Sequence, residues 1–146
     1  MSTNLHKGES TYYKTYNNVV DMLKCIGRNH VMINKTTDGD IYDIDLEKNT
    51  LFPIMHINPV SVQTGKSQLT YNFQIFIADL VEPHLENEQD VMSDTLHILT
   101  DIIAFLKHRL PTSEKFHIQD GSFTCEPFTE RFDNALFGWV MDLAII

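Results

Sequence analysis

The sequence predicts an α+β domain in which two α-helices pack on one face of a mainly antiparallel sheet that contains a long β-hairpin. Three observations lead to this prediction: two segments carry apolar residues at helical spacing, others alternate apolar and polar residues, and no repeat or linker divides the 146 residues. A domain of this length buries about two-thirds of the surface that its unfolded chain exposes. We therefore expect a single domain over residues 11–146, preceded by a flexible polar arm over residues 1–10.

The first helix is predicted between Thr11 and Gly27. Its apolar residues recur at spacings of three and four, as an amphipathic helix requires. They are Tyr12, Tyr16, Val19, Val20, Leu23 and Ile26. Cys25 lies beside this stripe, so we expect it to be a small core residue rather than a reactive thiolate.

An acidic, turn-rich segment follows over residues 34–50. Within it, Asp38-Gly39 marks a tight turn. Ile41 and Ile44 could anchor a short turn of helix.

The hairpin is predicted from two strands joined by a polar turn. Leu51–Ile57 forms the first strand, which Asn58-Pro59 breaks or bends, and the alternating segment Leu69–Val81 forms the second. The turn is Thr64-Gly65-Lys66-Ser67, in which Gly65 can supply the positive φ that such turns demand. We expect this turn to be an exposed tip.

The second strand should bury one face against the helices and leave a mixed face on the other side. The buried set is Leu69, Tyr71, Phe73, Ile75 and Ile77. The opposite set, with contributions from the last strand, is Thr70, Asn72, Gln74, Phe76, Ala78, Val140, Asp142 and Ala144. A neighbouring subunit could cover this mixed face.

The second helix is predicted to begin after Asn87, a good N-cap, and to run to Leu110, because Pro111 stops it. Its apolar stripe comprises Val91, Met92, Leu96, Leu99, Ile102, Ile103, Leu106 and Leu110. After it, Phe116–Ile118 should pair with Phe123–Cys125 across a turn at Asp120-Gly121. The final alternation from Phe137 to Ile145 should lie inside the sheet, since it stays apolar to its end.

Charge and composition exclude several classes of protein. Lys and Arg total 11 against 20 Asp and Glu, and the formal net charge of −9 argues against holding nucleic acid through its phosphates. Cys25 and Cys125 have no metal-type spacing, and the polar first residues contain no signal peptide, which together indicate a reduced, intracellular protein. No apolar run reaches the roughly 18 residues of a membrane span, so no membrane partner is expected.

Gly65-Lys66-Ser67 matches the last three residues of a phosphate-binding loop. That loop also needs a glycine where this chain has Val60, and a helix where this chain alternates like a strand. We therefore predict no bound nucleotide and no other cofactor.

No set of side chains converges on a recognised metal or catalytic motif. His84, Glu86 and Glu88 share a loop, and His97 and Asp101 lie four residues apart on a helix, but neither group has a third ligand at a known spacing. The thiol of Cys125 with His117 or His30, and the carboxylate pairs Asp43 with Asp45 and Glu126 with Glu130, offer no further signal. We predict no metal, no catalytic residue and no enzymatic activity.

In the segment 126–140, EPFTERFDNALFGWV, large apolar residues surround Glu130, Arg131 and Asp133 in a loop or a strand lead-in. Either these groups close the core over the helix ends, or they form an interface, where aromatic residues and Arg are enriched. The candidate interface residues, together with those of the hairpin turn, are Thr64, Gly65, Lys66, Ser67, Phe128, Glu130, Arg131 and Phe132.

Three phrases in this order, "HINPVSVQTGKSQLTYNFQIFIADLV", "SDTLHILTDIIAFLKHRL" and "PFTERFDNALFGWVMDLAII", resemble the tail-terminator, tail-completion and neck-ring proteins of the bacteriophage head-tail junction. The resemblance covers roughly residues 11–146 and rests on architecture rather than on a catalytic motif. The acidic segment 38–48 departs from the pattern, which leaves open which ring of the neck or tail is meant.

The resemblance implies a virion protein, assembled in the host cytoplasm, that forms a ring of identical subunits, commonly six or a multiple. The DNA would pass through the ring without sequence-specific binding, and the hairpin tip would reach a neighbouring subunit or an adjoining neck or tail protein. The alternative is an intracellular, non-catalytic adaptor or binding module of the same fold. A small hydrolase or metal enzyme using His84, His97 or Cys125 is a third possibility.

Overall fold

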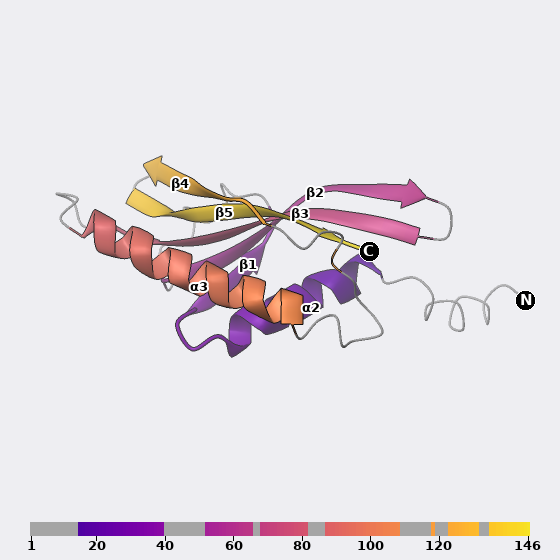
Figure 1. The fold of residues 1–146 in the computed structure, drawn as a ribbon, viewed down its shortest axis with the longest axis horizontal. Coiled ribbons are helices and arrows are strands. Elements are labelled where there is room, and N and C mark those ends of the chain that lie inside the picture. The colour runs from indigo at the N-terminus through magenta and orange to yellow at the C-terminus, as the bar shows by residue number, and fades with distance from the viewer. Residues whose placement is uncertain are drawn as a thin grey trace, which may run out of the picture.

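The computed structural model describes residues 15–39, 52–65, 68–81, 87–108, 118, 123–131 and 135–146. The elements, in chain order, are α2 (Tyr16–Asn29), β1 (Lys35–Asp38), β2 (Ile54–Gly65), β3 (Gln68–Leu80), α3 (Glu88–His108), β4 (Cys125–Arg131) and β5 (Ala135–Ile145). The five strands form one sheet in the order β1-β2-β3-β5-β4, in which only β1 and β2 pair in parallel. The predicted α+β class and the long β2–β3 hairpin are confirmed (Figure 1).

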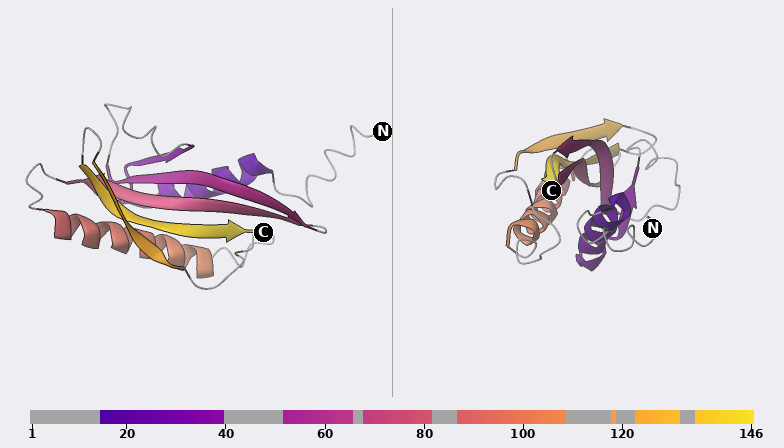
Figure 2. Two further views of the ribbon diagram at one scale, coloured as in Figure 1. Left: turned by 90° about the horizontal axis from the view of Figure 1, so that it is seen from above. Right: turned by 90° about the vertical axis from the view of Figure 1, so that its right-hand side faces the viewer.

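Both helices cover the same face of the sheet (Figure 2). A single buried cluster joins them to it, because α2 and α3 each contribute one apolar stripe and β3 and β5 contribute every second residue. The members from the helices are Val19, Val20, Leu23, Ile26, Ile98, Leu99, Ile102 and Leu106. Those from β3 and β5 are Tyr71, Phe73, Ile75, Ile77, Met141, Leu143 and Ile145. The predicted inward face of the hairpin strand is therefore correct.

Helix α2 begins later than its apolar pattern suggests. The Thr15 hydroxyl caps the helix by accepting the backbone N–H of Asn18 at 3.1 Å, and residues 11–14 lie outside the described residues. The prediction that Cys25 is a core residue is wrong, because its side chain is exposed. Cys25 lies about 200° around the helix from the buried Leu23, since each residue turns the helix by about 100°.

Strand β1 was not predicted. Its sequence, Lys-Thr-Thr-Asp, has no apolar alternation, and it pairs in parallel with the first four residues of β2, from Lys35 opposite Ile54 to Asp38 opposite Ile57. The predicted turn after it is present, because Gly39 has a φ of 110°, which favours glycine. Ile41 and Ile44 lie outside the described residues.

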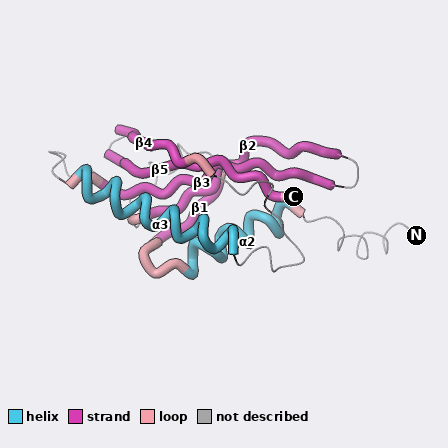
Figure 3. Tube along the Cα trace, viewed as in Figure 1, coloured by secondary structure: helices cyan, strands magenta, loops and turns pink. Residues whose placement is uncertain are grey.

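Strand β2 continues through Asn58-Pro59 for twelve residues, so the expected interruption is a bulge and not a break. The register with β3 shifts between Pro59 and Ser61. Before the bulge Ile54 and His56 face away from the helices, and after it Ser61 and Gln63 do so. Because β1 covers only Ile54–Ile57, the rest of β2 forms an edge of the described sheet (Figure 3).

The C-terminal part of the sheet confirms one prediction and corrects another. Strand β5 lies inside the sheet, between β3 and β4, as expected. However, Cys125 pairs with Met141 of β5, and Ile118 makes an isolated antiparallel bridge to Ile145, so the expected pairing of these two segments with each other is wrong. The segment after Cys125, expected to be a loop or a strand lead-in, forms strand β4.

Helix α3 follows Asn87, whose carbonyl accepts the N–H of Val91 at 2.9 Å. The helix is described to His108, and the predicted end at Leu110 lies outside the described residues. Its buried stripe also includes Thr95, which sequence patterning missed because Thr is polar. The Thr95 hydroxyl donates to the Val91 carbonyl at 2.6 Å, so its burial leaves no unsatisfied group.

Candidate functional site

The two groups of predicted interface residues lie at opposite ends of the sheet. Thr64 and Gly65 are exposed at the far end of β2, where the hairpin turns, and Lys66 and Ser67 lie outside the described residues. Glu130 and Arg131 end β4, whose last pair is Arg131 with Ala135. In the β3–β5 ladder, Tyr71 near the hairpin end pairs with Ile145, and Leu80 at the other end pairs with Leu136. The structure therefore does not bring the two groups together within one chain.

Phe128 belongs to the subunit's own packing. Its half-buried ring packs against a second cluster of Ile54, Ala78 and Leu136. It also meets the ring of Phe76 edge-on, with centroids 5.0 Å apart and planes at 70°. Phe128 therefore packs within the subunit, but on the face of the sheet away from the helices and not over the helix ends, whereas Phe132 lies outside the described residues.

The predicted mixed face exists, and only its polar half is open. The register places Asn72 beside Ala144, Gln74 beside Asp142, and Phe76 beside Val140. The apolar residues Phe76 and Ala78 are already covered, with exposed fractions of 7% and 0%, and the polar Thr70 nearer the hairpin is covered too, at 6%. A neighbouring subunit could therefore reach only the polar half.

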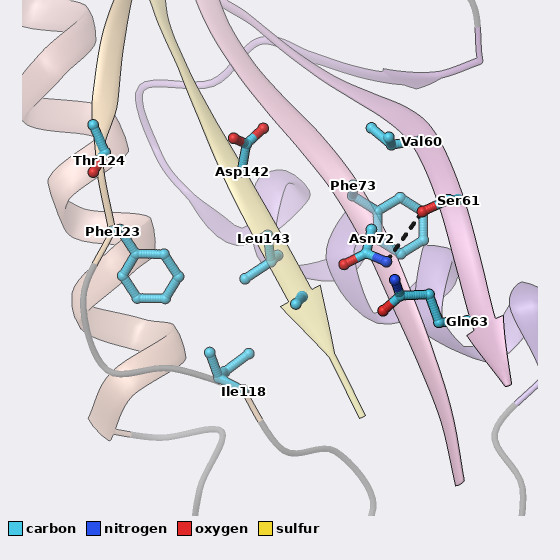
Figure 4. Close-up of a pocket in the computed structure, with 11 residues that line it drawn as sticks. Val60, Ser61, Gln63, Asn72, Phe73, Ile118, Phe123, Thr124, Asp142 and Leu143 are labelled. Atoms are coloured by element: carbon cyan, nitrogen blue, oxygen red, sulfur yellow. Dashed lines mark hydrogen bonds between the residues drawn. The ribbon is translucent and has the colours of Figure 1, made fainter. Parts of the chain in front are cut away.

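That polar half forms an open groove of about 550 Å³, which we call the outer groove. Its polar lining comes from Ser61, Gln63, Asn72 and Asp142, and Ile118 and Phe123 line the side across β5 from the hairpin strands (Figure 4). The Asn72 amide donates to the Ser61 hydroxyl at 3.1 Å, and nearby the Asn58 amide donates to the Gln74 side-chain oxygen at 3.0 Å. Amides and hydroxyls both donate and accept hydrogen bonds, and Asp142 adds a carboxylate, so the groove suits a polar surface that can supply hydrogen-bond donors.

The outer groove was not recognised in the sequence, although its β3 and β5 members were predicted to share a face. The sequence feature that could have revealed the groove was the pair of polar residues Asn72 and Gln74, which alternate with apolar residues along β3. Ser61 and Gln63 of β2 were missed because the register shift between Pro59 and Ser61 brings them, rather than Val62, onto that face; Val60, within the bulge, also lines the groove.

The hairpin end projects past both helices (Figures 1 and 2). Every residue of β2 from Pro59 to Gly65 is exposed, and Val60 and Val62 have exposed fractions of 57% and 48%. At its base the ring of Tyr16 lies against Phe73, with centroids 6.1 Å apart. Burial and, to a smaller extent, the negative charge of Asp38 raise the pKa of Tyr16.

Two histidines have structural roles. His56 is buried, and because the Gly39 carbonyl can only accept, the ring must donate to it from Nε2 at 2.8 Å. The Nδ1 atom then accepts the hydroxyl proton of Thr37 at 2.6 Å. Both nitrogens are therefore occupied, and His56 ties β1 and the turn after it to β2.

His30 is fixed in the same way between the two helices. Its Nδ1 accepts the Met32 N–H at 3.1 Å, so Nε2 carries the proton and donates to Asp101 at 2.9 Å. His97, predicted to lie near Asp101, is 3.8 Å from the same carboxylate oxygen. His30 has no free lone pair for a metal ion in this arrangement.

The described residues form neither a metal-binding group nor a site with an activated nucleophile. Among the residues with described positions, no three His, Cys, Asp or Glu side chains are grouped to hold a metal ion. Burial raises the pKa of the Cys125 thiol, which disfavours a reactive thiolate. His84, Glu86, Asp43, Asp45 and His117 lie outside the described residues.

A search against models of known protein families gives no match, and a search of curated protein sequences finds no relative. Of the helices in the described ranges, neither has the length and apolar character needed to cross a membrane.

Proposed function

We propose that this chain is a non-catalytic structural subunit that assembles with copies of itself into a ring of a bacteriophage tail or neck, around the channel through which DNA passes. One observation carries the proposal: the hairpin from Pro59 to Gly65 is exposed throughout and projects beyond the helices. These residues add nothing to the subunit's buried core, so contact with another surface is the role that suits them.

The placement of the two candidate groups supports a ring. A closed ring of identical subunits needs a contact between two different patches, repeated around an axis. The hairpin end with the outer groove, and the end of β4, lie at opposite ends of the sheet, so each subunit can offer one patch to each neighbour.

Charge suggests how these patches meet. Asp142 is exposed and is the charged residue among the described residues that line the outer groove. Arg131 ends β4 at the other end of the sheet. We propose that the end of β4 with Arg131 in one subunit meets the groove with Asp142 in the next, where their opposite charges attract.

Charge reversal tests this contact between subunits. Asp142→Arg and Arg131→Asp should each abolish rings in electron micrographs, because each brings like charges together. An equimolar mixture of the two variants should restore rings, since each variant then meets its complement on a neighbour. Asp21→Arg, an equal charge change on the exposed face of α2, is the matched control and should assemble like the wild type.

A wild-type chain that forms no rings would overturn the proposed function. Rings that survive both single reversals would instead remove the Arg131–Asp142 contact. An adaptor that binds one partner is the alternative, and the open, mainly amide and hydroxyl lining of the outer groove favours it. The adaptor predicts a monomeric wild type whose mass does not respond to Asp142→Arg.

A further inference from the structure

We infer that the free edge of β2 pairs with the same edge of a second copy, antiparallel and about a two-fold axis at Gln63. This contact goes beyond the proposed ring, because it is self-complementary and therefore joins copies in pairs rather than around a circle. In a ring protein, it would connect two rings.

The backbone of this edge is unpaired in the described part of the chain. β1 ends opposite Ile57, and no other described strand lies beside Asn58–Gly65 on that side. Unpaired strand edges readily accept another strand, and proteins normally guard them with charges, prolines or short length.

The register shows which groups are free. The Ile57 carbonyl accepts the Gly39 N–H at 3.0 Å, so Ile57 points its backbone groups toward β1 and away from its partner Ile75 on β3. Odd-numbered residues of β3 therefore bond to β5, because the β3–β5 register is continuous. Residues of β2 that pair with odd residues of β3 must then point their backbone groups to the free edge.

After the bulge those residues are Val62, opposite Tyr71, and Thr64, opposite Leu69. Pro59, opposite Phe73, belongs to the same set, as its missing N–H requires. Pairing two copies with Val62 opposite Thr64 of the second copy satisfies both residues on both chains and makes four hydrogen bonds. This register places Gln63 opposite Gln63 of the second copy, on the axis.

Charge identifies a second copy as the occupant. Each chain carries a formal net charge of −9, so copies repel over most of their surface. Asn58–Gly65 contains no charged residue, and the proposed register sets only uncharged residues against one another: Val62 against Thr64, Gln63 against Gln63 and Ser61 against Gly65. The other long edge is guarded, because β4 contains Pro127, Glu126 and Arg131.

The contact is small. Five residues on each strand bury much less surface than a standard stable interface, which buries about 1,200–2,000 Å² in total. A single pair of copies should therefore dissociate readily. Two rings joined by many such contacts would stay associated, because all the contacts must break at once for the rings to separate.

Disulfide trapping detects a weak contact of defined register. Directly opposed residues of antiparallel strands have Cβ atoms about 4.5–5.5 Å apart, close to disulfide range. With Cys25 and Cys125 replaced by Ser, Gln63→Cys should form a covalent dimer under mild oxidation. Val31→Cys in the same background, at a position that is 91% exposed, is the control and should remain at least tenfold less cross-linked.

A backbone test separates strand pairing from chance collision. Adding Val62→Pro to the Gln63→Cys variant removes an edge N–H without breaking the β2–β3 ladder, and it should abolish trapping, whereas Val62→Thr keeps the N–H and should not. Circular dichroism verifies that each variant is folded, and Val62→Lys provides a second disrupting variant that retains the N–H.

Cross-linking of Gln63→Cys no faster than the Val31→Cys control would overturn the inference, and so would trapping that both Val62→Pro and Val62→Lys leave unchanged. Neither result bears on the proposed Arg131–Asp142 contact, because the Asp142 and Arg131 reversals test it separately.

Discussion

The indole N–H of Trp139 on β5 donates to the backbone carbonyl of Met92 in the first turns of α3, at 2.8 Å. The ring also packs against the main core cluster. One side chain therefore joins β5 to the helix that covers it, both by packing and by a directed hydrogen bond.

Replacing Trp139 separates these two contributions. Trp139→Phe keeps most of the packing and loses the donor, so it should lower the free energy of unfolding by about 0.5–1.5 kcal/mol. Trp139→Ala also loses the ring and should cost about 3 kcal/mol or more. Because Trp139 is the single tryptophan, urea unfolding should be followed by circular dichroism. Equal losses for the two variants would contradict a packing role for the ring.

Gly138 should not tolerate a methyl group. A Cβ there would overlap the carbonyl oxygen of Ile77 and lie 2.8 Å from the Ala78 Cα, both in the backbone of the paired strand. Gly138→Ala should therefore force β3 and β5 apart and cost about 1–3 kcal/mol or more.

Gly27→Ala is the matched comparison. Its Cβ would lie 2.7 Å from the Met55 sulfur and 2.7 Å from the Thr36 hydroxyl, which are side-chain atoms that can shift. Alanine also gains up to about 1 kcal/mol of helix propensity over glycine. In thermal unfolding, Gly138→Ala should have a clearly lower midpoint temperature than Gly27→Ala. The reverse order would contradict the close approach of β3 and β5 at Gly138.

Asp79 should make stability depend on pH. Burial, with a smaller contribution from the nearby carboxylate of Asp94, raises the pKa of Asp79, and the hydrogen bond from the Leu80 N–H partly opposes this. A raised folded-state pKa contributes stability that is complete below the unfolded pKa of about 3.9 and is lost as the pH rises through the folded value.

Asp79→Asn keeps an oxygen to accept the Leu80 N–H and removes the charge. It should therefore be more stable than the wild type at pH 7, and the difference should shrink toward zero near pH 3. Urea midpoints at the two pH values give this comparison. A variant that is less stable than the wild type at pH 7 would show that the ionised Asp79 is favourable.

The sequence correctly predicted the elements in which the spacing of apolar residues repeats many times. The stripes of α2 and α3 and the alternations of β3 and β5 each repeat often enough to identify both the element and its buried face. Strand β1 was missed because four residues are too few to show a periodic apolar pattern. Cys25 was placed in the core wrongly, because a residue next to the apolar stripe in sequence can point to another side of the helix.

The missed parts of the candidate site depend on tertiary register. The bulge at Pro59 exchanges the faces of the β2 residues after it, which no local pattern reveals. Strand β4 contains Pro127 and charged residues and is recognisable only through its pairing with β5. The link from His30 to Asp101 spans 71 positions and follows from how α2 and α3 pack.

The central claim is that this chain acts by contact with copies of itself. The most direct measurement is the molar mass of the wild-type protein by multi-angle light scattering over a wide range of concentrations. The account predicts masses that rise with concentration toward a fixed multiple of the 16.9 kDa chain. A mass of 16.9 kDa at every concentration would contradict it.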